Sequence, residues 1–236
     1  MEAIEAGSTL DKIFLKNDTT GELSRELNSL CRERGIPVQR VPLEKLNRLT
    51  RNNHQGAIAF ISPVAYQDLE EVTTRVFETG EMPAILILDG ITDTRNFGAI
   101  ARTADCAGFD AIVIPDRGSV SVTPEAVKTS AGALFHIPVC RVRNIVDTIR
   151  LLKAMGVQTV GASEKASVAY TATDMNMPLA IVMGAEDTGI SPQALRECDR
   201  LAAIPILGNI SSLNVSVAAG VMMYEVVRQR GRLHNQ

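Results

Sequence analysis

Asn96 and Arg102 follow a short apolar strand, AILILDG, and offer an amide and a guanidinium for binding polar groups of a ligand. They are six residues apart, about 600° around a helix, so they would lie on different helical faces. They could reach one site only if Asn96, a suitable helix cap, lies in the loop before the helix. Gly98 would let the first helical turn approach another backbone closely. The alternative is a capped helix with a solvent-exposed arginine.

A second polar cluster follows the strand IVM, where Gly184 and Gly189 flank Glu186 and Asp187. Loops at the carboxyl ends of parallel strands are where α/β proteins bind ligands. Gly184 would let a cofactor approach the backbone, and either acid could hold hydroxyl groups or order the loop. The cluster contains neither a GxGxxG motif nor a P-loop lysine, which argues against a nicotinamide or ATP site. A tight left-handed turn is the alternative.

The third cluster, GNISSLNVS, lies between an apolar strand and a long apolar helix. Ser211 or Ser212 is expected to cap that helix, with Asn214 and Ser216 in its first turns. A cap requires only one of these polar side chains, so the others are available to a ligand. The small residues 218–220 suit close helix packing, either within the chain or across a dimer interface.

A fourth cluster is basic and reads RVPLEKLNRLTRNNH from residue 40 to residue 54. Its leucines recur at helical spacing, which leaves the polar side chains exposed. The segment is either a solvated helix face or a patch that binds RNA phosphates without reading the base sequence. Aromatic residues make up only 4% of the chain, which argues against a broad base-stacking platform. The candidate RNA-binding residues are Arg40, Lys45, Arg48, Arg51 and His54.

These clusters need a scaffold, and the alternation of short β-branched runs with helical patterns predicts an α/β protein with largely parallel strands. Strands are expected at Lys12–Leu15, Pro37–Val41, Ala57–Ile61, Ile85–Leu88, Ala111–Ile114, Ile137–Val142, Gln158–Val160, Ala180–Met183 and Leu201–Ile204. Helices are expected at Gly21–Arg34, Phe97–Ala107, Ile145–Met155 and Leu213–Arg230.

The chain's 236 residues predict one large domain or two modest ones. A boundary is expected between Gln67 and Met82, where an acidic, polar segment ends at Gly80 and Pro83. The formal net charge of −3 argues against binding nucleic acid through bulk positive charge. It leaves room for a local basic patch.

Four cysteines and three histidines are scattered along the chain, so no metal site is expected. Isolated thiols in a chain of this size favour a reducing, cytoplasmic location. The N-terminus shows no signal peptide. The most apolar late stretch, Val215–Val227, is about 13 residues long and contains Glu225, too short to span a bilayer. No membrane association is therefore expected.

In their order and spacing, the three polar clusters resemble the motifs of SpoU-type RNA ribose 2′-O-methyltransferases of the SPOUT superfamily. The segment from Glu2 to Ile61, with GIPVQRV and NHQGAIA, resembles the L30e-like substrate-binding domain of the RlmB branch, which methylates a guanosine of 23S rRNA. The resemblance implies an RNA-binding domain over residues 1–75, a linker over 76–83 and a methyltransferase domain over 84–236. It also implies a parallel sheet flanked by helices, a C-terminal trefoil knot, S-adenosylmethionine as cofactor and a homodimer.

The resemblance also assigns roles to individual residues. The implied catalytic residues are Asn96, Arg102, Glu186, Ser212 and Asn214, and the implied cofactor-binding residues are Gly184, Ile204 and Leu213. A guanidinium keeps its proton in proteins, so Arg102 is expected to hold the phosphate beside the 2′-hydroxyl and polarise that hydroxyl. Glu186 is expected to brace the loops rather than act as the base.

Two other functions remain open at this stage, a tRNA 2′-O-methyltransferase and a catalytically silent RNA-binding protein. Family members usually begin with a short strand and a G-x-H/N-x-V-x-E-A-L segment. This chain starts inside that segment, at Met1–Gly7, so the first strand of the RNA-binding domain is expected to be missing or replaced.

Overall fold

The computed structural model describes residues 9–231, which form two compact units that meet between residues 65 and 66. The prediction that the first strand of the RNA-binding domain is missing or replaced falls on Met1–Gly7, which lie outside the described residues. The boundary lies earlier than the expected residue 75, because helix α4 (Leu69–Glu78) belongs to the second unit. Leu69 and Val72 of this helix are buried in the core of that unit, and residues 76–78 of the linker expected at 76–83 form the end of the helix.

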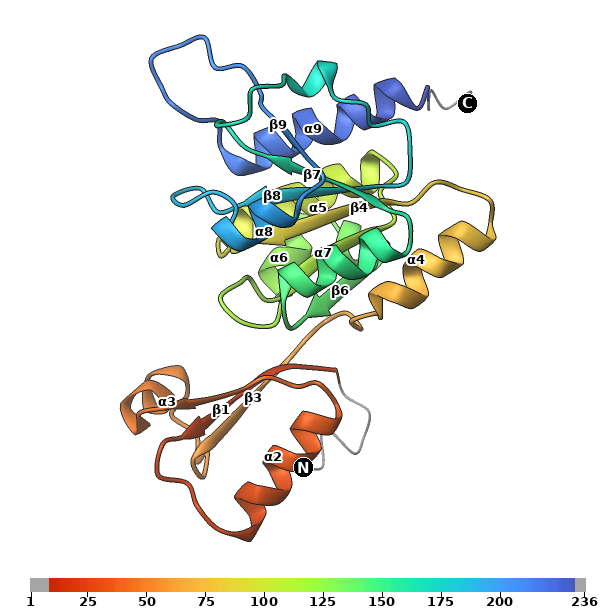
Figure 1. The fold of residues 1–236 in the computed structure, drawn as a ribbon. Helices are drawn as coiled ribbons and strands as arrows, with labels where there is room; N and C mark the ends of the chain where they lie inside the picture. The colour runs from red at the N-terminus through yellow and green to blue at the C-terminus, as the bar shows by residue number, and fades with distance from the viewer. Residues whose placement is uncertain (1–8, 232–236) are drawn as a thin grey trace. The chain divides into compact units, whose positions relative to one another are not determined.

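The first unit is a small three-stranded sheet with one helix on each face (Figure 1). In the order β2-β1-β3, the central strand pairs in parallel with β2 and antiparallel with β3. Its elements are β1 (Leu10–Lys16), α2 (Glu22–Glu33), β2 (Val38–Val41), α3 (Leu43–Leu49) and β3 (Ala57–Ile61).

Alternate side chains of the first sheet point to opposite faces, and each face has its own apolar core. Leu10 and Ile13 pack with Cys31 of α2 on one face. Phe14 packs with Val41 and with Leu46 of α3 on the other face. The sheet therefore separates everything on the α2 face from everything on the α3 face.

The second unit is a six-stranded, fully parallel sheet in the order β6-β5-β4-β8-β7-β9. Its strands are β4 (Ala84–Asp89), β5 (Ala111–Pro115), β6 (Val139–Val142), β7 (Gln158–Ala162), β8 (Leu179–Gly184) and β9 (Arg200–Ala202). Its other helices are α5 (Thr94–Cys106), α6 (Pro124–Thr129), α7 (Ile145–Ala154), α8 (Pro192–Glu197) and α9 (Val215–Gln229), with 3₁₀ turns at Ala133–Phe135 and Tyr170–Ala172.

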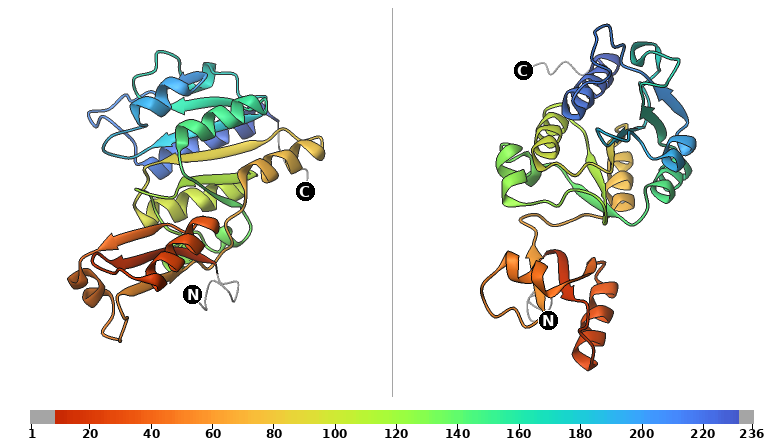
Figure 2. Two further views of the ribbon diagram at one scale, coloured as in Figure 1. Left: turned by 60° about the horizontal axis from the view of Figure 1, so that its bottom comes forward. Right: turned by 90° about the vertical axis from the view of Figure 1, so that its left-hand side faces the viewer.

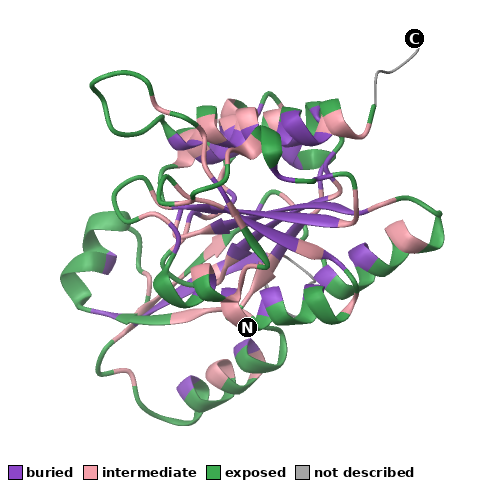
Figure 3. Ribbon diagram, turned by 45° about the horizontal axis from the view of Figure 1, so that its top comes forward, coloured by how far each residue is buried: buried purple, intermediate pink, exposed green. Residues whose placement is uncertain are grey.

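Helices cover both faces of this sheet (Figure 2). The core of one face brings together side chains of α4, α7 and α8, whereas α5 packs against α6 and α9 on the other. The strands accordingly read as continuous apolar runs, and Ile85–Leu88 is fully buried (Figure 3). The expected α/β class and the parallel sheet flanked by helices are confirmed.

The nine expected strands all form, with shifts at their ends. The last strand, expected at Leu201–Ile204, is observed at Arg200–Ala202, which leaves Ile204 in the following loop. Gly98 behaves as expected, since an added Cβ would lie 2.5 Å from Thr129 Cβ and 3.1 Å from Ala126 O. Helix α5 can therefore approach α6 only because residue 98 has no side chain.

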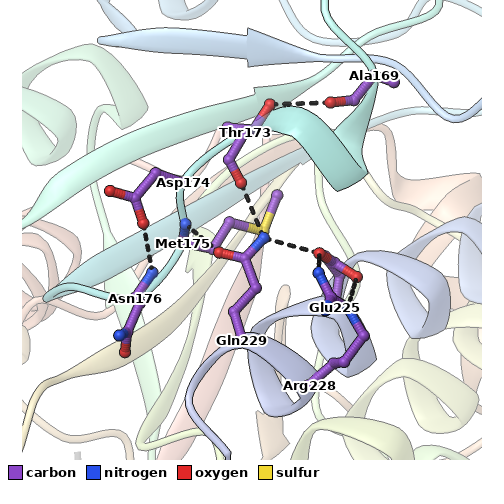
Figure 4. Close-up of polar contacts among 8 residues, drawn as sticks. All are labelled: Ala169, Thr173, Asp174, Met175, Asn176, Glu225, Arg228 and Gln229. Atoms are coloured by element: carbon purple, nitrogen blue, oxygen red, sulfur yellow. Dashed lines mark hydrogen bonds and ion pairs between the residues drawn. The ribbon is translucent and has the colours of Figure 1, made fainter.

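The end of α9 is fixed to the connection between β7 and β8 (Figure 4). Gln229 Nε2 donates to Thr173 O at 2.9 Å, and Gln229 Oε1 accepts from Met175 N at 2.7 Å. Gln229 Nε2 also donates to Glu225 Oε1, which accepts from Arg228 Nη2 at 2.6 Å. The trefoil knot expected at this end of the chain stays a prediction.

Within residues 9–231, no helix has both the length and the apolar character needed to cross a bilayer.

The stability of the protein should depend on the ionised form of Glu225, which is only 5% exposed. Hydrogen bonds from the Arg228 guanidinium hold the pKa of Glu225 below its usual value, and the Gln229 amide adds to this effect. Such a carboxyl stabilises the fold above its unfolded pKa of about 4.3 and loses that contribution as the pH falls through the folded pKa. Glu225→Gln should lower the free energy of unfolding by about 1–2 kcal/mol at pH 7 in urea titrations.

The deficit of the Glu225→Gln variant should shrink as the pH falls below about 4.3, because the wild-type carboxyl then becomes neutral as well. The matched control is Glu78→Gln, which changes an exposed glutamate at the end of α4 and should leave stability nearly unchanged. A deficit that stayed constant from neutral to acid pH would contradict the role given to the charge.

Candidate functional site

The three polar clusters of the second unit meet at one carboxylate oxygen, Glu186 Oε1. It accepts hydrogen bonds from Asn96 Nδ2 at 3.1 Å, from Asn214 Nδ2 at 2.6 Å and from the backbone nitrogen of Val215 at 3.4 Å. Asn214 Nδ2 also donates to Asn96 Oδ1 at 3.1 Å. Residues separated by as many as 118 positions thus form one polar cluster.

Local helix capping presents two of these side chains, in a way that differs from the expectation. Asp93 caps α5 by accepting from Asn96 N at 2.8 Å. Asn96 is therefore not the cap and does not lie in the preceding loop. It stands in the first helical turn, where its side chain is free to reach Glu186.

The start of α9 is also capped differently from the expectation. Asn214 caps this helix by accepting from Ser216 N at 3.0 Å, so neither Ser211 nor Ser212 is the cap. The helix begins at Val215, three residues after Ser212, which lies in the preceding loop. Because the Asn214 amide nitrogen remains available, one side chain both starts α9 and binds Glu186.

The loop that carries Glu186 folds back on itself directly after β8. Ala185 and Gly189 exchange backbone hydrogen bonds, Ala185 N to Gly189 O at 3.2 Å and Gly189 N to Ala185 O at 2.8 Å. A Cβ on Gly184 would lie 2.0 Å from both Gly189 C and Ile190 N. The closest neighbour of Gly184 is therefore the loop's own backbone, whereas the sequence suggested that this glycine makes room for a cofactor.

A cleft of about 340 Å³ lies beside the polar cluster. Its walls come from the loops after β7, β8 and β9, which are adjacent in the sheet. The expected cofactor-binding residues Gly184, Ile204 and Leu213 all line it, as do Glu186 and Ser212. The cleft thus lies at the carboxyl ends of neighbouring parallel strands, the place where this class of fold binds ligands.

Residues 162–165, with the sequence ASEK, also line the cleft and were not expected from the sequence. They follow β7, which precedes β8 in the chain and lies between β8 and β9 in the sheet. The strand order alone brings them to the site. The one available signal was their position just after a predicted strand.

Arg102 shares helix α5 with Asn96 but, among the described residues, is not hydrogen-bonded into the polar cluster. Its side chain is exposed on α5, and no hydrogen bond or ion pair joins it to Asn96, Glu186, Ser212 or Asn214 within the described residues. This agrees with the 600° separation expected for six residues on a helix, since α5 includes both Asn96 and Arg102. The guanidinium is accessible to a ligand that approaches from solvent.

The five candidate RNA-binding residues do not form one surface. Arg40 shares the α2 face of the first sheet with Val38, its neighbour two positions earlier. The other four candidates, Lys45, Arg48, Arg51 and His54, are on or directly after α3, which covers the opposite face.

Lys45 and His54 also make contacts of their own. Lys45 Nζ lies 4.7 Å from the Phe14 ring centre, a cation–π contact. His54 Nδ1 accepts from Gly56 N at 3.0 Å, and His54 Nε2 contacts Asn47 Oδ1 at 2.9 Å. Arg48 and Arg51 are exposed, and no side-chain partner holds either of them within residues 9–231.

Two cysteines of the second unit, Cys140 and Cys198, are protected by burial. Burial raises the pKa of Cys198 to about 12, with the negative charge of Asp199 adding to the shift. Burial likewise raises the pKa of Cys140 to about 12, so both thiols keep their protons at neutral pH. In this part of the chain, no three His, Cys, Asp or Glu side chains gather closely enough to hold a metal ion.

Comparison with known families assigns both units. The SpoU rRNA Methylase family matches residues 83–224. The chain belongs to this family. A second family, described as RNA 2′-O ribose methyltransferase substrate binding, matches residues 1–67. The protein is therefore an RNA 2′-O-ribose methyltransferase of the SpoU family. Its methyltransferase domain follows a substrate-binding domain of the kind found in such enzymes.

Similar proteins cover nearly the whole chain. A relative from Staphylococcus saprophyticus, assigned by name to the TrmH family of tRNA/rRNA methyltransferases, is 41% identical over 97% of this chain and 92% of its own length. The crystal structure of an AdoMet-bound rRNA methyltransferase from Sinorhizobium meliloti is 28% identical, with a TM-score of 0.62 over 96% of this chain and 83% of that chain.

A third similar protein is a TrmH/SpoU tRNA modifying enzyme from A. aeolicus. Its crystal structure is 29% identical, with a TM-score of 0.58 over 69% of this chain and 84% of that chain. The names of these proteins include both tRNA and rRNA enzymes. The expected SpoU family is thus confirmed, and the RlmB branch stays a prediction.

Gly184→Ala should disrupt the loop that carries Glu186. The added Cβ would overlap backbone atoms of Gly189 and Ile190, and overpacking of this kind costs roughly 1–3 kcal/mol. Thermal unfolding should show a lower Tm, and calorimetric titration with S-adenosylmethionine should show weaker binding, because the same loop lines the cleft.

Gly208→Ala is the matched control, since no atom lies within 4 Å of its added Cβ, and it should leave the Tm unchanged. Wild-type stability and cofactor affinity in Gly184→Ala would show that the backbone contact does not hold the loop.

Proposed function

We propose that this SpoU-family enzyme methylates the ribose 2′-hydroxyl of a guanosine in 23S rRNA. The observation that carries the proposal is the convergence of Asn96, Glu186 and Asn214 beside a cleft formed by three strand-end loops. This arrangement fixes a polar wall next to a pocket of suitable size for a nucleoside cofactor.

The lining of the cleft fits S-adenosylmethionine, the cofactor of this reaction. Ile204 and Leu213 supply apolar surface for an adenine ring, while Ser163 and Ser212 supply hydroxyl groups. The carboxylate of Asp187 suits a positively charged ammonium or sulfonium group. When bound, the cofactor supplies an electrophilic methyl group.

Glu186 positions the two asparagines rather than removing a proton. Its Oε1 atom already accepts three N–H donors, which holds the carboxylate as an acceptor between α5 and α9. Asn96 and Asn214 then present amide groups at a fixed separation. These amides and the hydroxyl of Ser212 orient the ribose for in-line attack, which requires close alignment of the reacting atoms.

Arg102 binds the phosphate next to the target ribose and polarises the 2′-hydroxyl. The guanidinium keeps its charge at physiological pH, so it stabilises the developing alkoxide and does not act as the base. The proton leaves late to a phosphate oxygen or to water. The exposed position of Arg102 suits contact with a substrate that arrives from solvent.

The first unit supports rRNA over tRNA as the substrate. The similar rRNA methyltransferase structure from Sinorhizobium meliloti covers 96% of this chain, so it includes the first unit. The A. aeolicus tRNA modifying enzyme covers 69%. An enzyme that carries an additional RNA-binding domain suits a large, folded RNA. This substrate and the isolated thiols support a cytoplasmic location.

The proposed function and the role of Arg102 are tested together by mapping 2′-O-methyl groups on 23S rRNA and on tRNA after reaction with the protein. Wild-type protein should methylate one guanosine of 23S rRNA. Arg102→Ala should slow this reaction at least about tenfold at saturating cofactor, because a charge-assisted hydrogen bond of roughly 1.5–3 kcal/mol is lost.

Arg196→Ala serves as the control, because Arg196 is exposed on α8, which packs on the sheet face opposite α5. Methylation of tRNA alone would replace the rRNA proposal with the tRNA alternative. An absence of methylation and of cofactor binding would favour a silent RNA-binding protein. Wild-type activity of Arg102→Ala would remove the role given to that residue.

We propose further that the enzyme is a homodimer joined through the start of α9 and the loop before it. Leu207 and Ile210 in that loop are 97% and 77% exposed, and Val217 and Tyr224 of α9 are 52% and 51% exposed. Val217 and Tyr224 are seven residues apart and so share one helical face. Large apolar side chains exposed along one segment of the chain favour an interface with a second copy.

Sedimentation velocity tests the dimer. Wild-type protein should sediment as a dimer at micromolar concentration, and Val217→Glu should shift it toward monomer, because a charge would be buried without a partner. Leu23→Glu changes an exposed leucine on α2, 72% exposed, and should remain dimeric. A wild-type monomer would contradict the proposal.

A further inference from the structure

The first unit contains a second cleft, on the face of its sheet opposite α3. It has a volume of about 390 Å³ and lies between helix α2, the loop before that helix and strand β2. Three arginines line it, and no acidic side chain does so among the described residues. The whole chain has a net charge of −3, so the cleft is a local region of positive charge on an acidic protein.

Two of these arginines are arranged along one face of α2. Arg25 and Arg32 are seven residues apart, about two helical turns, so their side chains lie on the same face. Asn28 lies between them and also lines the cleft. Within residues 9–231, neither guanidinium forms an ion pair with an acidic side chain, so both charges are available to a ligand.

The third arginine, Arg40, extends from β2 and is held in place by the backbone. Its Nη1 atom donates to Asn17 O at 2.8 Å and to Thr19 O at 3.1 Å. A guanidinium has five N–H donors, so donors on Nε and Nη2 remain after these two bonds. A positioned guanidinium loses less side-chain entropy when it binds an anion than a free one does.

The remaining lining residues indicate the class of ligand. Thr20 and Ser29 present hydroxyl groups, and Gly21 leaves the start of α2 without a side-chain cap. No aromatic side chain lines the cleft among the described residues, which argues against stacking of bases. Arginines combined with small hydroxyl side chains are the groups that contact phosphate and sugar in nucleic-acid complexes.

We propose that the cleft of Arg25, Arg32 and Arg40 binds the phosphate backbone of the substrate RNA and positions it without reading its sequence. The inference rests on the proposed function for the identity of the RNA. It adds a binding surface on the α2 face, separate from the basic segment on α3. RNA then contacts the first unit on the α2 face of its sheet, where Arg40 lies, and not on the face covered by α3.

The test measures binding of a 23S rRNA transcript by the full-length protein as a function of salt concentration. Each phosphate contact contributes about 0.7–0.9 to the slope of log K against log salt. Arg25→Gln/Arg32→Gln should therefore reduce the magnitude of that slope by about 1–2 and weaken binding at low salt. Arg25→Lys/Arg32→Lys keeps both charges and should retain most of the slope.

Arg196→Gln/Arg200→Gln is the matched control. It removes the same charge from two exposed arginines of the second unit, so it corrects for the change in net charge. The Tm and the affinity for S-adenosylmethionine should be unchanged in the Arg25→Gln/Arg32→Gln variant. An equal loss of slope in the control, or a wild-type slope in the cleft variant, would overturn the inference.

A competition arm separates RNA phosphates from a free anion. At constant ionic strength, inorganic phosphate should displace the rRNA transcript no better than chloride does if the cleft binds a polyanion. If the cleft variant lost phosphate binding but kept its RNA binding, the site would be one for a small anion and the proposal would be wrong.

The outcomes also separate this inference from the proposed function. Weaker RNA binding by the cleft variant, in a protein that methylates no RNA, would support the cleft and contradict the function. If the wild-type protein methylated the rRNA and the cleft variant bound RNA as tightly as wild type, the function would be supported and the cleft proposal contradicted.

Discussion

One hydrogen-bonded carboxylate oxygen holds the candidate active site together. Glu186 Oε1 joins Asn96 near the start of α5 to Asn214 and Val215 at the start of α9. Hydrogen bonds to a carboxylate are stronger than those between neutral groups, and a negative charge is also favourable at the N-terminus of a helix. This oxygen therefore ties the first turn of α5 to the start of α9, beside one wall of the cleft.

The parallel sheet supplies the second constraint. Because β8, β7 and β9 are neighbours that run in the same direction, their following loops meet at one edge. Because the strands themselves are buried, the polar groups of this site come from the loops that follow them. Gly184 then allows the Glu186 loop to close over the end of β8, because a side chain there would overlap the loop backbone.

In the first unit, the two faces of the sheet determine which basic side chains lie together. The segment from residue 40 to residue 54 is continuous in sequence, but the chain passes from one face of the sheet to the other between Arg40 and α3. Arg40 consequently joins Arg25 and Arg32 of α2. A net charge of −3 is compatible with RNA binding, because the few arginines gathered on one surface are the phosphate contacts proposed above.

The sequence by itself determined the α/β class, the nine strands, the family and the identity of the polar residues that meet in the second unit. The class and the strands follow from apolar periodicity and local residue types, which act over a few positions, whereas the family was inferred from the order and spacing of three polar clusters along the chain. It did not determine the caps of α5 and α9, because Asp93 and Asn214 compete with equally suitable neighbours such as Asn96 and Ser212.

Only the tertiary structure decided the strand order, which brought residues 162–165 into the cleft. It also decided the assignment of α4 to the second unit and the division of the basic residues between two faces. Each of these depends on which distant apolar surfaces pack together. That packing is a property of the whole fold, and no local sequence window contains it.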